Sequence, residues 1–160
     1  MAKKPDDGTI TVATNRSARH DFSITEDFEA GIVLTGSEVK SLRESKAQIS
    51  EAFAQVRNGE VWLHNLHVAQ YSHSQGHFSH EPLRVRKLLM HRREIDRLAL
   101  RLQQERLSLV PLRLYFKDGR AKVSIGVGKP KTKGDKRQDI AKRDAARDAS
   151  REMGRAFKQS

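Results

Sequence analysis

Residues 109–127 decide the fold prediction, and they read Leu109-Val110-Pro111-Leu112-Arg113-Leu114-Tyr115-Phe116-Lys117-Asp118-Gly119-Arg120-Ala121-Lys122-Val123-Ser124-Ile125-Gly126-Val127. Asp118-Gly119 at their centre suits a two-residue type I′ turn. Apolar and polar residues alternate on both sides of this turn, which predicts an antiparallel hairpin with one buried face. The residues expected on that face are Val110, Leu112, Leu114 and Phe116 before the turn, and Ala121, Val123, Ile125 and Val127 after it. Pro111 falls on the other face, which indicates an edge strand or a bulge.

A second hairpin is predicted around Asn58-Gly59, which separates the segment Ala52–Arg57 from the segment Glu60–Val68. The earlier stretch Phe22–Leu34 is typical of a bent strand, and it places Phe28, Ala30 and Ile32 on one side.

Two segments have the period of a helix. In His91–Arg106 the apolar positions repeat at i, i+3, i+4 and i+7, and they are Ile95, Leu98, Ala99 and Leu102. A shorter helix is predicted at Ser37–Leu42, with Thr35 or Ser37 as its N-cap. Short strands joined by tight turns, with a few helices, predict a mainly β protein built as a small barrel or an open antiparallel sheet.

The chain of 160 residues suits one domain and an extension. We expect a flexible N-terminus at residues 1–9, a β-barrel domain at residues 10–128 and a basic tail at residues 129–160. The chain has no cysteine, which excludes a disulfide framework and a thiolate zinc site and suits a reducing cytoplasm. The first residues contain no apolar run and no stretch reaches the length of a membrane span, so we expect a soluble cytoplasmic protein with no signal peptide and no membrane partner.

The charge is concentrated in the tail. The whole chain carries a net charge of +11, and residues 129–160 hold eleven Lys and Arg against five Asp and Glu. Ile140, Met153 and Phe157 are its only large apolar residues, too few to bury a helix face. Ion pairs at helical spacing are expected at Asp139–Arg143, Asp144–Arg147, Asp148–Arg151 and Glu152–Arg155. We therefore expect a tail that is disordered in the free protein and folds as a helix on RNA, whereas a solvated basic tail is the simpler alternative.

The outward face of the 109–127 hairpin is the strongest local sign of a binding site. A two-residue turn places Tyr115 opposite Lys122 and Lys117 opposite Arg120, with Arg113 further along the same row. An aromatic ring between cations on a sheet can stack bases and bind phosphates, although an ordinary solvated strand face has the same pattern. Two other basic clusters, Arg84–Arg93 and Arg16–His20, resemble common surface charge when each is taken alone.

Metal binding and catalysis find little support. Five of the seven histidines fall between His64 and His80, but His64 and His67 would point to opposite faces of a strand. Asp27 and Glu29 would share a face, yet two carboxylates without a third ligand are a weak metal site. The chain shows no nucleophile elbow and no phosphate-binding loop of the usual pattern. We expect no metal, no cofactor and no enzymatic activity.

Several blocks of the chain closely resemble the SsrA-binding protein (SmpB) family. They lie in collinear order along almost the whole sequence, and they are Asn15–Phe22, Phe28–Ile32, Thr35–Arg43, Arg84–Leu89, Leu112–Phe116 and Asp135–Arg137. The resemblance implies an antiparallel barrel of the oligonucleotide-binding kind with three flanking helices and a C-terminal tail. It also implies a trans-translation factor, which binds the tRNA-like domain of tmRNA and brings it to stalled ribosomes.

The resemblance carries the family's RNA contacts to His20, Glu29, Leu89 and Lys122, and it places the tail in the messenger channel of the small ribosomal subunit near the decoding region. With the residues argued above, the predicted RNA-binding set is Asn15, Arg16, His20, Glu29, Arg86, Leu89, Tyr115 and Lys122. The predicted ribosome-binding set is Lys129, Lys131, Lys133, Asp135, Lys136, Arg137 and Met153. The chain departs from the family's usual pattern at Gly134, Ala145 and Glu152, so charge would hold this tail more than apolar contacts do.

Two other functions fit parts of the sequence. A general ribosomal protein or translation factor of the same barrel type would be equally basic without preferring tmRNA. An RNA-cleaving or RNA-modifying enzyme could use Asp27, Glu29 and a histidine, but it would lack a third acidic ligand. We expect a non-catalytic protein that is monomeric when free.

Overall fold

The computed structural model describes residues 8–71 and 80–158 and has four helices and nine strands in these ranges. The strands are β1 (Thr9–Thr14), β2 (Phe22–Ile32), β3 (Ala47–Gln48), β4 (Phe53–Arg57), β5 (Glu60–His64), β6 (His67–Val68), β7 (Arg86–Leu89), β8 (Ser108–Lys117) and β9 (Arg120–Pro130). The helices are α1 (Ala18–Asp21), α2 (Gly36–Arg43), α3 (Arg92–Gln104) and α4 (Lys133–Lys158). The expected N-terminal flexibility falls mostly on residues 1–7, which lie outside the described residues.

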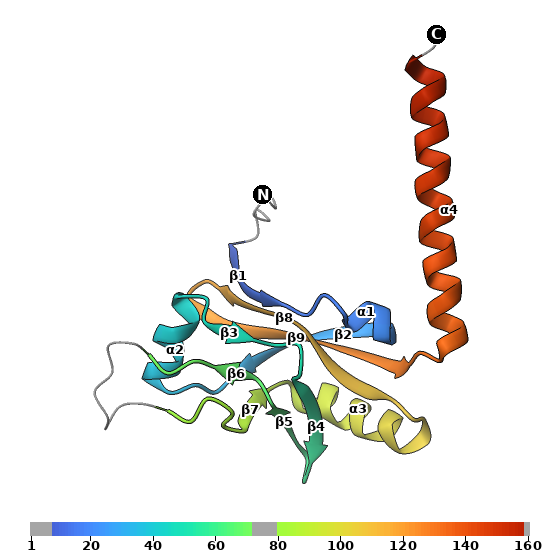
Figure 1. The fold of residues 1–160 in the computed structure, drawn as a ribbon. Coiled ribbons are helices and arrows are strands. Elements are labelled where there is room, and N and C mark those ends of the chain that lie inside the picture. Colours follow the sequence, from blue (N-terminus) through green and yellow to red (C-terminus); the bar gives the residue numbers. More distant parts are fainter. Residues whose placement is uncertain (1–7, 72–79, 159–160) are drawn as a thin grey trace.

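Seven strands form one antiparallel sheet in the order β1-β8-β4-β5-β7-β2-β9, and a pairing of β8 with β9 curls this sheet back on itself. The curl is weakest between β4 and β8, where Ala54 and Leu109 form the single paired position. Three helices flank the sheet and α4 extends beyond it (Figure 1). The predicted class is therefore confirmed, as a mainly antiparallel β fold of the oligonucleotide-binding type.

Both predicted hairpins are present. Asn58 and Gly59 join β4 to β5, and Asp118 and Gly119 join β8 to β9. All four residues have a positive φ, between 51° and 78°, as a type I′ turn requires. Tyr115 lies opposite Lys122 and Lys117 opposite Arg120, as the turn length predicts.

A bulge in β8 corrects the predicted faces of this hairpin. The register shifts between Pro111 and Arg113, so Leu112 is an extra residue. Before the bulge the alternation is inverted, and Leu109 packs in the main core. Val110 and Leu112 instead bury Ala18 of α1 in a small second cluster. Pro111 indicated this bulge in the sequence. Proline lacks a backbone N–H, and it is tolerated where the hydrogen bonds between strands are interrupted.

The main core lies inside the curled sheet and under α2 and α3. Phe28, Ala30 and Ile32 of β2 face it, as predicted. Helix α3 buries Ile95 and Leu98 against it, and Arg97 and Arg101 hold the carboxylate of Glu26 on β2. Helix α2 begins with a capping box, because Thr35 accepts from the N–H of Glu38 while Glu38 accepts from the N–H of Thr35.

The tail is a helix of 26 residues that projects from the body beside α1 (Figure 1). At 1.5 Å per residue it is about 39 Å long. No described helix is both long and apolar enough to cross a membrane.

Candidate nucleic-acid interface

The register of four strands places four of the eight predicted RNA-binding residues on one outward face of the sheet. Leu89 of β7 lies opposite Gly31 of β2, Gly31 opposite Lys122 of β9, and Lys122 opposite Tyr115 of β8. Glu29 lies two residues from Gly31 on β2 and shares its face. We call these residues the cross-strand row, and they are Leu89, Gly31, Glu29, Lys122 and Tyr115. Three of the four RNA contacts implied by the family resemblance therefore lie together.

Glu29 is the hydrogen-bond acceptor of this row, and its neighbours hold its carboxylate in place. The Tyr115 hydroxyl donates a hydrogen bond to its Oε2, and the Lys117 ammonium lies 3.6 Å from the same oxygen. The hydrogen bond from Tyr115 lowers the pKa of the Glu29 carboxyl below its usual value, and the charges of Lys117 and Lys122 act in the same direction. Glu29 is therefore ionised at neutral pH, with one oxygen held by Tyr115.

The structure corrects the role predicted for Tyr115. Its side chain is only 4% exposed, so its ring cannot serve as an open platform for bases. The guanidinium of Arg113 lies over the ring, 4.3 Å from its centroid. Burial raises the pKa of the Tyr115 phenol, and the bond to Glu29 raises it further. The phenol thus remains a hydrogen-bond donor at any physiological pH.

Leu89 and Lys122 supply the accessible part of the row. Leu89 is 53% exposed, which is unusual for a leucine within a sheet. A Cβ added at Gly31 would lie 3.3 Å from the Cβ of Leu89, so the glycine leaves that side chain its room. Lys122 is half-buried, and in the part of the chain that the structure describes it forms no ion pair. Its ammonium is therefore available to a phosphate.

The predicted RNA contact at Arg86 is wrong, because this side chain is 0% exposed. Its guanidinium donates to Oε2 of the buried Glu38, to the Leu66 carbonyl at 2.7 Å and to the Pro82 carbonyl at 3.2 Å. Burial alone would raise the pKa of Glu38. The bonds from Arg84 and Thr35, together with the charge of Arg86, lower it instead. Arg86 is a structural residue that ties β7 to α2.

Three predicted RNA contacts lie in α1 or in the loop before it, and they differ in their exposure to solvent. Asn15 is buried, and its side-chain amide donates to the Pro111 carbonyl at 3.0 Å, so its role is structural. Arg16 is exposed and lines a groove of about 530 Å³ beside the cross-strand row. His20 is half-buried, with its Nδ1 3.1 Å from Asp21 Oδ1, and it does not line this groove.

Polar groups of the body contact the root of the tail. Lys136 lies 3.3 Å from the Asp21 carboxylate, and Lys131 donates to the Arg19 carbonyl at 2.8 Å. Hydrogen bonds from His20 and Lys136 lower the pKa of Asp21. Asp139 binds Lys131 in place of the predicted Arg143. The direction in which α4 leaves the body is therefore set by α1.

The other tail predictions have mixed outcomes. Asp144 and Arg147 form the predicted ion pair at 2.5 Å. Lys129 lies 3.8 Å from Glu105, and Arg137 is exposed. The side chains of Lys133, Asp135 and Met153 lie outside the described part, so their predicted roles stay predictions.

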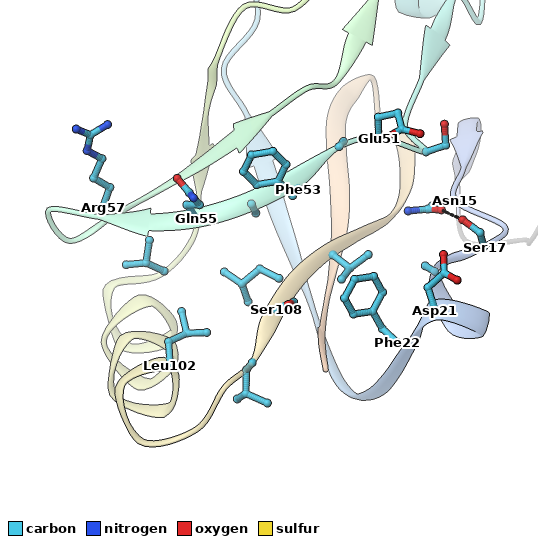
Figure 2. Close-up of a pocket in the computed structure, with 18 residues that line it drawn as sticks. Asn15, Ser17, Asp21, Phe22, Glu51, Phe53, Gln55, Arg57, Leu102 and Ser108 are labelled. Atoms are coloured by element: carbon cyan, nitrogen blue, oxygen red, sulfur yellow. Dashed lines mark hydrogen bonds between the residues drawn. The ribbon is translucent and has the colours of Figure 1, made fainter. Parts of the chain in front are cut away.

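The largest of the cavities described, of about 730 Å³, lies at the weak β4–β8 seam (Figure 2). It shares only Asn15 with the groove. Phe22, Leu102 and Val110 form apolar parts of its wall. Its charged lining consists of Asp21, Glu51 and Arg57, a net negative set that suits phosphate poorly. The cavity therefore does not extend the nucleic-acid face.

The histidine-rich segment offers no metal site in residues 8–71 and 80–158, where no group of three His, Asp or Glu side chains lies close enough together. His64 stacks on Phe53 with ring centroids 5.0 Å apart. His80 bonds Ser37 and the Val68 carbonyl, which gives it a structural role. His73 and His77 lie outside the described residues.

A curled antiparallel sheet with an outward row of acceptor, cation and apolar contact defines a small nucleic-acid-binding protein of the oligonucleotide-binding type. Comparison with known proteins narrows this class. The profile of the SmpB protein family matches residues 12–155. The chain therefore belongs to the SmpB family.

Individual relatives agree with this assignment. The SsrA-binding protein of Mycobacteroides abscessus is 53% identical over 158 residues, which cover 99% of both chains. That of Salinispora arenicola is 55% identical over 152 residues, 94% of each chain. A solved structure described as "tmRNA-SmpB: a journey to the center of the bacterial ribosome" contains a similar chain. It is 42% identical with a TM-score of 0.63, over 80% of this chain and 93% of that one.

Proposed function

We propose that this chain is a non-catalytic RNA-binding protein that binds the tRNA-like domain of tmRNA and delivers it to stalled ribosomes for trans-translation. The observation that carries the proposal is the cross-strand row, where Glu29, Leu89 and Lys122 share one outward face. Membership of the SmpB family supports the choice of RNA, and so does the name SsrA-binding protein, which its relatives carry.

The three accessible members of the row, Glu29, Leu89 and Lys122, have complementary roles. Lys122 pairs with a phosphate, while Leu89 packs against a ribose or a base. Glu29 accepts hydrogen bonds from a base edge, because an ionised carboxylate can only accept. This carboxylate repels the RNA backbone in general, so it makes binding selective for an RNA that presents donors at this point.

The tail acts on the ribosome. Helix α4 is narrow and about 39 Å long, so it suits a channel otherwise occupied by messenger RNA. Its outer surface is basic along Lys142, Arg143, Arg147 and Arg151, which favours contact with ribosomal RNA. The root of the tail contacts the decoding region of the small subunit. The protein acts in the cytoplasm and is monomeric when free.

A filter-binding titration tests the proposal. The full chain is titrated against the tRNA-like domain of tmRNA and against an elongator tRNA of similar length, at two salt concentrations. We expect tighter binding to the tRNA-like domain at both, with a similar salt slope for the two RNAs because their phosphate contacts are similar. Equal affinity for the two RNAs would reject tmRNA specificity and favour a general translation factor.

A further inference from the structure

A polar groove lies beside the cross-strand row and has no role in the mechanism above. It has a volume of about 530 Å³ and is bounded by the loop and helix at Thr14–Arg19 and by the outward faces of β2, β8 and β9. Its charged lining consists of Arg16, Arg19, Arg113 and Asp27. A volume of this size lies within the range of about 300–1,000 Å³ that is typical of small-ligand sites.

The walls of the groove are fixed by buried contacts. Asn15 donates from its backbone N–H to the Leu112 carbonyl at 2.8 Å and from its side chain to the Pro111 carbonyl at 3.0 Å. Ala18 is buried against Val110 and Leu112. These contacts hold the loop that carries Arg16 and the helix that carries Arg19. On the opposite wall Arg113 is fixed by its stack on Tyr115.

The charged groups of the groove do not neutralise one another. Among the described residues, no ion pair within 4.0 Å joins Asp27 to any of the three arginines, although all four line the same space. Asp27 is exposed on β2 and lies opposite Gly126 of β9, whose side-chain position is filled by Ile24 and Leu112. The groove therefore presents separate cationic and anionic positions with room for a ligand between them.

We propose that this groove binds one guanine nucleotide of the RNA, turned out of its helix, as a subsite of the interface proposed above. Arg16 and Arg19 contact its phosphates. The base stacks on the free side of the Arg113 guanidinium, as unpaired bases stack on arginine planes. Asp27 accepts from the Watson–Crick edge of the base.

The carboxylate of Asp27 selects the base. Guanine presents two adjacent donors on that edge, N1–H and the 2-amino group, which match the two oxygens of a carboxylate. Adenine and cytosine present one amino donor beside an acceptor nitrogen, and uracil presents one imino donor between two carbonyl groups. These acceptors face a carboxylate unfavourably, so guanine is the base expected here.

An affinity measurement with a charge-matched control tests the subsite. Asp27→Asn should weaken binding to the tRNA-like domain about tenfold, because a bidentate contact to one base is lost. Its binding to oligouridine should stay equal or become tighter, because one negative charge has been removed. Asp96→Asn on α3 makes the same charge change away from the groove. This control should not weaken binding to either RNA. If Asp27→Asn binds the tRNA-like domain as tightly as Asp96→Asn does, the subsite is refuted.

A titration of the ¹⁵N-labelled full chain separates this proposal from the proposed function. Guanosine monophosphate should shift the amide signals of Ser124 and Arg113, and inosine monophosphate, which lacks the 2-amino group, should bind several-fold more weakly. Equal effects of the two nucleotides would refute base reading by Asp27, even if the wild type still prefers tmRNA. Selective guanosine binding by a chain without tmRNA preference would instead retain the subsite and reject the proposed function.

Discussion

The hydrogen bond from Tyr115 to Glu29 gives the most informative single change, Tyr115→Phe. The variant removes one oxygen and leaves the ring, so the buried packing under Arg113 is retained. A hydrogen bond to a charged acceptor contributes about 1.5–3 kcal/mol. The side chain of Glu29 is 40% exposed, and water can replace part of that bond. We therefore expect a loss of about 1 kcal/mol in the free energy of unfolding at neutral pH.

The same change should weaken binding to the tRNA-like domain. Without the phenol, Glu29 is free to turn toward Lys117, and its second oxygen no longer faces the RNA in a fixed direction. A loss of about 1 kcal/mol corresponds to roughly a fivefold higher Kd. A double-mutant cycle with Glu29→Gln isolates the coupling, and both RNA affinity and urea unfolding should be measured for all four proteins.

The pH dependence of the unfolding free energy gives the double-mutant cycle an independent control. The pKa of Glu29 is lowered in the folded protein, so its stabilising contribution is present above the usual glutamate pKa of about 4.3 and is lost as pH falls through the lower folded pKa. The difference in stability between wild type and Tyr115→Phe should therefore be largest near neutral pH and shrink in acid. A coupling near zero in the cycle, together with a pH-independent difference, would refute the positioning role of Tyr115.

Three further predictions follow from the geometry. Lys122→Ala should weaken binding to the tRNA-like domain by about 1–3 kcal/mol in a filter-binding titration while its unfolding free energy stays within about 0.5 kcal/mol of wild type, and unchanged affinity would remove Lys122 from the site. Arg86→Met should cost about 3–5 kcal/mol in urea unfolding because it leaves the buried carboxylate of Glu38 short of a partner, and an unaltered midpoint with weaker RNA binding would contradict its structural role. Deleting residues 134–160 should leave a cooperative melt and tmRNA binding with modest loss but abolish peptide tagging on ribosomes stalled on truncated messages, whereas full tagging by the truncated chain would reject the role of the tail.

Much of the fold could be predicted because its signals are local. Asn58-Gly59 and Asp118-Gly119 fix two hairpins through the positive φ that each turn requires. The capping pattern Thr35-Gly36-Ser37-Glu38 fixes the start of α2 in the same way. The face of β8 before Leu112 could not be predicted from alternation, since a single extra residue inverts the faces.

The site was harder to predict, because its contacts join distant strands. Tyr115 was correctly placed opposite Lys122, but its burial depends on Glu29 and Arg113, which alternation alone does not bring over the ring. Arg86 lies in a basic run that resembles surface charge, and its buried partner is Glu38 on another element. The one available signal for the burial of Arg86 was Glu38, the glutamate of the capping box. A carboxylate that caps the start of a helix can also accept a hydrogen bond from a buried arginine.

The tail illustrates a different limit. Its composition predicts a segment without a core of its own, and the described part of α4 agrees with that expectation. Composition does not show that Asp21 and the Arg19 carbonyl hold its root, because each contact is a single exposed polar pair between segments far apart in the sequence.

The most direct test of the central claim is to sequence the RNA that co-purifies with the full chain from a bacterial lysate. Enrichment is the count of each RNA divided by its share of the total RNA in the lysate. The matched control is the chain that lacks residues 134–160, which retains the cross-strand row. We predict that tmRNA is the most enriched RNA in both samples and that ribosomal RNA is enriched only with the full chain. RNAs recovered in proportion to their abundance, with no preference for tmRNA, would contradict the account.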